Sequence, residues 1–269
     1  MNTLPQRSGT IALRSESGLL ELWHLLSLDA PTVATLWTCF VARVTHTTMA
    51  PEFPVAMFLA VWILYAADRL LDARSAAGLE ARHRFHDAHR FGFLVAIGVA
   101  SAGLVGLVVL ARLPVVAFAL YSGLAAGLGL WFMTVHRAPG RSLPKEVVTG
   151  AFFSAAIYVP FVSRVTLVPA ILFAALCSVN CLYIHSWENA EGAPAHATTG
   201  LARRFLPQIS LGLILFPLVH LGPMSVAISA AAGLLVLLNR FHADVEATTL
   251  RAAADLVLLT PLLVLPFLS

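Results

Sequence analysis

Two carboxylates one helical turn apart, Asp68 and Asp72, are the residues of this chain whose spacing best suits chemistry. They end an apolar run, and a basic, histidine-rich segment follows them as far as Arg90. In a helix, residues i and i+4 lie on one face, so both acids would face the same way. Bare, the pair repels itself, whereas a divalent cation makes it a clamp. It predicts either a Mg²⁺ site for a diphosphate or a charged helix end paired with Arg69 and Arg74.

A second polar cluster ends another apolar run and favours the first of these interpretations. Asn180 lies inside that run, and Glu188 and Glu191 follow at its end. Mg²⁺ prefers hard oxygen ligands and often bridges carboxylates to substrate phosphates. If this cluster faces the aspartate pair at the end of an apolar bundle, the two together would hold the polar head of a ligand at the mouth of the bundle and its apolar tail inside.

Basic residues near the same ends are candidates for binding phosphate oxygens. Arg137 and Lys145 flank one predicted connection between helices, and Arg82 and Arg84 follow the aspartate pair. Arginine binds phosphate oxygens through paired hydrogen bonds. Arg82 and Arg84 have an alternative role in membrane topology or in binding anionic lipid. Four aromatic residues are candidates to line an isoprenoid cavity: Tyr65, Tyr158, Tyr183 and Trp187.

The composition indicates a membrane protein built from helices. The chain is 59% hydrophobic and 12% charged, with a mean hydropathy of +0.84. A soluble domain of 269 residues needs more polar surface than this. Lipid cannot satisfy backbone polar groups, and the apolar runs are too continuous for alternating barrel strands. We therefore expect an all-α, polytopic transmembrane bundle in contact with membrane lipids, and no nucleic-acid partner.

The apolar runs predict about nine transmembrane helices in one domain. Residues 1–30 would form an N-terminal cytoplasmic segment, with an amphipathic helix at 18–28 lying at the membrane interface. Residues 31–269 would form a single transmembrane domain. The expected spans are 31–50, 53–71, 91–111, 114–135, 147–164, 167–186, 206–221, 224–240 and 252–268.

The distribution of basic residues predicts the orientation of the bundle. With nine spans, fourteen of the 17 Lys and Arg residues fall on the side of the N-terminus, leaving Arg43, Arg112 and Arg164 on the other. Cytoplasmic loops carry such an excess of positive charge. We expect a multi-pass protein of a bacterial-type inner membrane, with a cytoplasmic N-terminus and the Asp68–Asp72 pair at a cytoplasmic mouth.

These residues resemble motifs of the UbiA superfamily of intramembrane prenyltransferases. That family's first motif is typically N-x-x-x-D-x-x-x-D; here Asp68 and Asp72 match its acids, and Leu64 stands in place of the asparagine. Residues 25–31 resemble the entry to the family's first helix. Residues 134–137 resemble the end of its fourth helix, and Gly150 also fits. The resemblance implies nine helices, two Asp-rich motifs on helices two and six, and Mg²⁺-dependent use of prenyl diphosphates.

The second motif departs further from the family's pattern. With Gly200 as the family's downstream glycine, the motif's three ligand positions are occupied by Asn180, Ile184 and Glu188. The asparagine is kept, one acid is replaced by isoleucine, and the other is a glutamate. The resemblance thus implies that Asp68 and Asp72 bind one metal ion, and that Asn180 and Glu188, with Glu191 nearby, bind a second.

The leading expectation is an integral-membrane, Mg²⁺-dependent enzyme that transfers a prenyl group from an isoprenoid diphosphate to a lipophilic acceptor. Asp68, Asp72 and Glu188 would be its catalytic residues. One alternative is a terpene cyclase, which needs no acceptor, and another is a lipid-binding protein with a decayed metal site. A transporter that relays protons through Asp68, His185 and Glu188 is a third.

Overall fold

The computed structural model describes residues 17–75, 81–111, 113, 115–137, 145–188, 197–219 and 222–268, and every regular element within them is helical. The longer helices are α2 (Asp29–Val44), α3 (Glu52–Ser75), α5 (Arg90–Ala111), α6 (Val115–Arg137), α7 (Lys145–Tyr158), α8 (Leu167–Glu188), α10 (Leu206–Val219), α11 (Pro223–Arg240) and α12 (Ala247–Val257). The shorter ones are α1 (Ser17–Leu25), α4 (Ala81–Ala88), α9 (Ala197–Arg204), α13 (Pro261–Val264), η1 (Val159–Phe161), η2 (His242–Asp244) and η3 (Leu265–Phe267).

Several of these helices are long and apolar enough to cross a membrane. Among the described residues, α3, α5, α6, α8 and α11 meet that description alone. Two bent pairs, α1 with α2 and α12 with α13 and η3, raise the number to seven if each pair is one span. With 14 residues each, α7 and α10 fall short of the roughly 20 that a perpendicular span needs. Each of the nine expected segments contains a helix, but nine spans remain a prediction.

Proline and glycine mark several helix boundaries. Pro223 opens α11 directly after Gly222, at the position where the missing N–H costs nothing. Pro261 opens α13, and the chain bends by 42° between α12 and α13. Because proline cannot donate to the preceding turn, the last apolar segment forms a bent pair rather than one straight helix.

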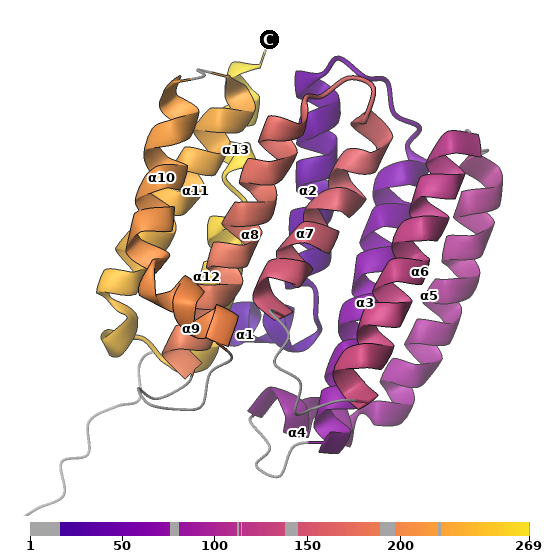
Figure 1. Cartoon of the computed structure of the whole chain (residues 1–269). Helices are drawn as coiled ribbons and strands as arrows, with labels where there is room; N and C mark the ends of the chain where they lie inside the picture. Colours follow the sequence, from indigo (N-terminus) through magenta and orange to yellow (C-terminus); the bar gives the residue numbers. More distant parts are fainter. Residues whose placement is uncertain are drawn as a thin grey trace, which may run out of the picture.

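The helices alternate in direction, which gathers particular helix ends at one end of the bundle (Figure 1). The C-terminal ends of α3, α6 and α8 and the N-terminal ends of α7 and α12 lie at the lower end in that view, together with α1, α4 and α9. Arg43 lies at the opposite end, where its Nη2 donates to the carbonyl of Leu268. The polar clusters of the sequence therefore meet at one end, as the arginine distribution predicts.

The main core lies where α2, α7, α8 and α11 meet. Trp37 is fully buried on α2, with its ring centroid 4.2 Å from that of Phe173 on α8. A Cβ on Gly150 of α7 would lie 2.6 Å from the carbonyl oxygen of Ala174. A glycine is therefore required at this approach of α7 to α8, in keeping with the small residues typical of helix contacts in membranes.

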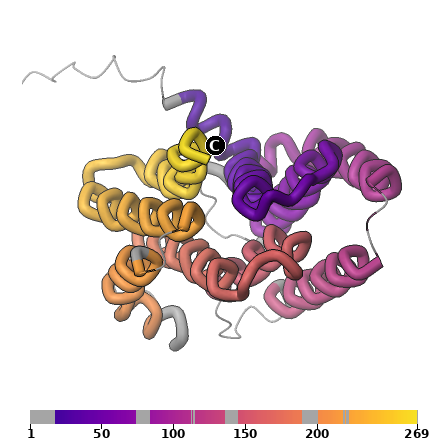
Figure 2. The backbone as a smooth tube through the Cα atoms, turned by 90° about the horizontal axis from the view of Figure 1, so that it is seen from above, coloured from indigo at the N-terminus to yellow at the C-terminus, as the bar shows by residue number. Residues whose placement is uncertain are grey.

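By contrast, α5 and α6 expose most of their apolar side chains. Val99 and Val109 on α5 and Val116 and Leu130 on α6 are each at least 64% exposed. Seen from above in Figure 2, α5 and α6 form the side of the molecule farthest from α10 and α11. Exposed apolar surface of this extent fits contact with lipid.

A sharp corner joins α1 to α2. The two helices are bent by 85°, and Ser27 adopts a left-handed φ of 58° at the turn. Trp62 Nε1 of α3 donates to the Leu26 carbonyl at 3.0 Å, and Ser27 Oγ lies 3.3 Å from Nε2 of the buried His86 of α4. The expected N-terminal helix is confirmed, but it ends at Leu25 rather than at residue 28, and its location at the membrane interface stays a prediction.

Candidate functional site

A cavity of about 700 Å³ opens among α2, α3, α5, α6, α7, α8 and α12. This volume lies within the range of small-molecule sites, roughly 300–1,000 Å³. Five of the metal- and phosphate-binding candidates proposed from the sequence line the cavity: Asp68, Asp72, Lys145, Asn180 and Glu188.

The aspartate pair lies on the cavity face of α3. Asp68 is half-buried, Asp72 is exposed, and Leu64 one turn earlier lines the same wall. This arrangement confirms that the i, i+4 spacing gives both acids one direction. Because α3 ends three residues after Asp72, the pair lies near the end of the bundle where α7 begins and α8 ends.

The beginning of α7 and the end of α8 add charged groups to this part of the cavity. Lys145 is exposed at the start of α7, and Glu146 Oε1 lies 3.6 Å from His185 Nδ1 of α8. Lys145 is therefore available to a phosphate group that enters between the two helices. Glu146, to which the sequence pattern assigned no role, also lines the cavity.

Glu188 makes an ion pair with a partner that the sequence did not suggest. Arg251 of α12 donates from Nη1 to Glu188 Oε1, across 63 residues of sequence. Both side chains are about one-quarter exposed and both line the cavity. The negative charge of Glu188 is therefore compensated in this structure, and it would be available to a cation only if Arg251 moved away.

Through Arg69, the residue after Asp68, a buried ionic network joins α3 to α1 and α2. Asp29 Oδ2 lies 2.7 Å from His24 Nδ1 and accepts a hydrogen bond from Arg69 Nη2 at 3.1 Å. Asp29 Oδ1 accepts from the backbone N–H of Ala30, and Arg69 Nη1 donates to the His24 carbonyl. Asp29 is thus surrounded by donors, the arrangement that a buried carboxylate needs.

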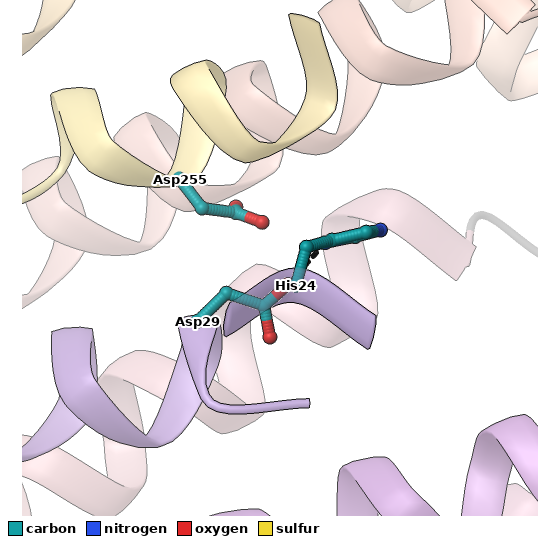
Figure 3. Close-up of side chains that lie close together, drawn as sticks. All are labelled: His24, Asp29 and Asp255. Atoms are coloured by element: carbon teal, nitrogen blue, oxygen red, sulfur yellow. Dashed lines mark hydrogen bonds and ion pairs between the residues drawn. The ribbon is translucent and has the colours of Figure 1, made fainter. Parts of the chain in front are cut away.

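Next to this network, Asp255 of α12 is paired with Asn180 of α8. Asn180 Nδ2 donates to Asp255 Oδ1 at 3.0 Å, and both residues line the cavity. Oxygen or nitrogen atoms of Asp255, Asp29 and His24 lie within 4.8 Å of one another, and Figure 3 shows these side chains converging from three helices. The Asn180 side-chain carbonyl oxygen is buried without a hydrogen-bond partner.

Other residues proposed from the sequence lie elsewhere. Arg84 is exposed on α4 and is not among the cavity-lining residues. The side chains of Arg82 and Arg137, and the whole of Glu191, lie outside the described part of the chain. Their proposed roles stay predictions.

Of the four aromatic candidates, only Tyr65 lines the cavity. Tyr183 instead shares a hydrogen bond with Ser210, and Trp187 donates one to Asn239. The aromatic lining comes mostly from other residues, among them Trp131 and Phe132 of α6. The aromatic residues near the end of α8 contact neighbouring helices, so their position in the sequence did not predict the lining of the cavity.

Asp255 is a cavity acid that sequence reasoning missed. It is a carboxylate within the last apolar segment, four residues after Arg251. Acids inside a membrane span are costly and tend to be functional, so this position carried a usable signal. The Asp–x–x–x–Asp spacing drew attention to α3 instead, because an isolated acid has no spacing to interpret.

The oxygen atoms around the cavity fit a hard divalent cation. They include carboxylates from Asp68, Asp72 and Asp255 and the unpartnered amide oxygen of Asn180. Mg²⁺ favours such ligands and binds few of them directly when a diphosphate supplies the rest.

No protein-family model matches the chain, and no curated protein or solved structure matches it either.

Proposed function

We propose that this chain is an integral-membrane, Mg²⁺-dependent enzyme that acts on an isoprenoid diphosphate within a nine-span, UbiA-like bundle. One observation supports the proposal most. A single cavity has acids, Lys145 and Arg251 at one end, and walls of apolar side chains such as Leu104 and Leu128 along the rest. An isoprenoid diphosphate has the same division between a charged head and an apolar tail.

The proposed roles of the chain's residues follow from their places along the cavity. Asp68 and Asp72 would hold one Mg²⁺, and the polar group around Asn180 a second. Bound Mg²⁺ would neutralise the diphosphate and stabilise it as a leaving group. Lys145 would hold phosphate oxygens at the mouth, with Arg137 as a further candidate from the adjoining helix end.

The reaction would begin with heterolysis of the bond between carbon 1 of the prenyl group and the diphosphate oxygen. The bonding electrons leave with the diphosphate, and the allylic cation stays among apolar walls that exclude water. In prenyl transfer, an electron pair of a lipophilic acceptor closes the new bond and the acceptor loses a proton. In a terpene cyclase, a double bond of the same chain would close a ring before the proton is lost.

A second candidate is a lipid-binding protein that keeps the fold and has lost the chemistry. Two observations favour it: Ile184 lines the cavity where the resemblance expects an acid, and Glu188 is paired with Arg251. Such a protein would bind apolar lipid in the cavity without using Mg²⁺ or diphosphate. It would therefore gain thermal stability from neither ligand.

The test is diphosphate release by the purified full-length protein in detergent, with allylic diphosphates of several chain lengths and with or without an aromatic acceptor. We expect Mg²⁺-dependent release by the wild type and loss of release in Asp68→Asn, because that variant removes one ligand charge without changing side-chain size. Asp87→Asn, an exposed acid on α4, is the matched control and should keep full activity.

Product analysis separates the chemical alternatives. A prenylated acceptor indicates transfer, and a hydrocarbon or alcohol formed without acceptor indicates cyclisation. Full Mg²⁺-dependent turnover by Asp68→Asn would refute the assignment of that residue. A wild type with no turnover and no stabilisation by Mg²⁺ or diphosphate would favour the lipid-binding protein.

A further inference from the structure

Asp255 is a cavity-lining acid whose described partners are an amide and a second carboxyl group. It accepts a hydrogen bond from the Asn180 amide and shares another with the side chain of Asp29. Asp29, the neighbouring acid, differs because it accepts hydrogen bonds from Arg69 and from the backbone N–H of Ala30. It also pairs with His24. When ionised, a carboxylate in the interior of a bundle needs a compensating positive charge, and no described cation contacts Asp255 as Arg69 contacts Asp29.

The charges of this region differ between the empty and the cation-bound site. Fully ionised, Asp29 and Asp255 would carry two negative charges, whereas Arg69 carries one positive charge that is directed to Asp29 and to the His24 carbonyl. With no cation bound and His24 neutral, a proton in the hydrogen bond between the Asp29 and Asp255 carboxyl groups balances these charges. A bound cation would take the place of that proton and compensate the ionised Asp255 in the low-dielectric interior of a bundle.

An independent observation points to a ligand at the same place. Asn180 is only 3% exposed, and its side-chain oxygen has no hydrogen-bond partner although its amide nitrogen bonds Asp255. A buried acceptor without a partner costs about 1–3 kcal/mol. An oxygen-seeking cation between this amide oxygen and the Asp255 carboxylate would satisfy both groups.

The position of Asp255 also corresponds to the acid that α8 lacks. Ile184 follows Asn180 by one helical turn and lines the same cavity, so an acid at position 184 would point toward the same space. Asp255 reaches this space from α12, a different helix. Its contact with Asn180 spans 75 residues of sequence.

We propose that Asp255 and Asn180 form a divalent-cation site at the inner part of the cavity, in which Asp255 supplies the carboxylate that Ile184 does not. Asp29 belongs to the structural network, since its oxygens already accept from donors. Glu188 is held by Arg251 and lies outside the inner site. The assignment rests on the proposed function for the identity of the cation, but its test does not need turnover.

The experiment is a Mn²⁺ titration of the full-length protein in detergent, with free Mn²⁺ followed by electron paramagnetic resonance and no substrate present. We expect two bound Mn²⁺ per wild-type chain and the loss of one in Asp255→Asn. Asp68→Asn should lose the other. Asp244→Asn removes an exposed acid of η2 outside the cavity and should keep both.

A rescue variant distinguishes ligation from a merely structural role. Adding Ile184→Asp to Asp255→Asn should restore the second Mn²⁺, because an acid then faces Asn180 from α8. If Asp255→Asn does not fold, Ile184→Asp alone decides: a second acid at the site should tighten Mn²⁺ binding severalfold, and unchanged binding would overturn the proposal.

Two further outcomes also contradict it. One is an Asp255→Asn variant that keeps the wild-type Mn²⁺ count, as expected if the proton between Asp255 and Asp29 is never displaced by a cation. The other is a folded double variant that does not regain the lost ion. If Mn²⁺ binding depends on Asp255 while the wild type shows no diphosphate release, the cation site stands and the proposed enzyme function fails.

Discussion

Arg69 is a buried base that links α3 to α1 and α2. It is 6% exposed, and like Asp68 and Asp72 it lines the cavity. Its guanidinium bonds both the Asp29 carboxylate and the His24 carbonyl. The helix α3 thus supplies two acids to the cavity wall and, from the next residue after Asp68, a base whose hydrogen bonds reach α1 and α2.

We predict that Arg69→Met lowers the stability of the protein strongly. The variant leaves Asp29 buried without its cationic partner, a change that typically costs about 3–5 kcal/mol. The measurement is the thermal unfolding midpoint in detergent. Arg90→Met, which removes an exposed arginine at the start of α5, should have little effect.

The double variant Asp29→Asn, Arg69→Met gives the control for charge. Because it removes both members of the pair, it should recover part of the stability lost by Arg69→Met alone. Equal midpoints for Arg69→Met and the wild type would show that the ion pair contributes nothing to folding.

At the level of helix pairs, the contact between α7 and α8 determines the positions of Lys145, Glu146 and Asn180. A Cβ on Gly150 would lie 2.3 Å from Ser178 Oγ and 2.8 Å from Ser178 N. The nearest atoms include backbone, which cannot move aside as a flexible side chain can. Separation of the two helices is therefore the expected response to any larger residue here.

We predict that Gly150→Ala destabilises the protein by about 1–3 kcal/mol through overpacking. The same displacement should weaken Mn²⁺ binding near Asn180, because α7 and α8 both line the cavity. Gly212→Ala on α10 is the matched control: nothing lies within 4 Å of its added Cβ. Thermal unfolding of the two variants tests this, and a loss as large in Gly212→Ala would assign the effect to helix propensity or lipid contact instead.

For the molecule as a whole, the arrangement of helix ends agrees with the arginine distribution. Asp87 of α4 lies at the end of the bundle where α3 finishes, and Arg164 follows η1 at the opposite end (Figure 1). Both residues are exposed. If the end rich in arginine is cytoplasmic, the cavity with its acids opens toward the cytoplasm.

We predict which side of the membrane exposes a single introduced cysteine, in a protein whose native Cys39, Cys177 and Cys181 have been replaced. In intact cells, a membrane-impermeant maleimide should label Arg164→Cys, whereas Asp87→Cys should react only after the membrane is opened. Denatured samples of each variant control for expression and for the intrinsic reactivity of the thiol. The reverse pattern would invert the topology, and labelling of both would contradict a membrane between them.

Properties that depend on local periodicity could be predicted from the sequence. Continuous apolar runs require helices in lipid, and each expected span contains one. The i, i+4 spacing of Asp68 and Asp72 places them on one face because helix geometry is the same wherever the helix lies. The asymmetry of arginine likewise marks one set of helix ends without knowledge of their packing.

Contacts between distant helices could not be obtained in this way. Nothing near Glu188 in the sequence indicates that Arg251 neutralises it, and nothing near Ile184 indicates that Asp255 occupies the adjacent space. These pairs depend on how α8 and α12 pack, and packing follows from side-chain shape over the whole bundle. The direction of the two acids on α3 therefore follows from local sequence. The charged partners across the cavity depend instead on the packing of α8 against α12, whose contacting residues are more than 60 positions apart.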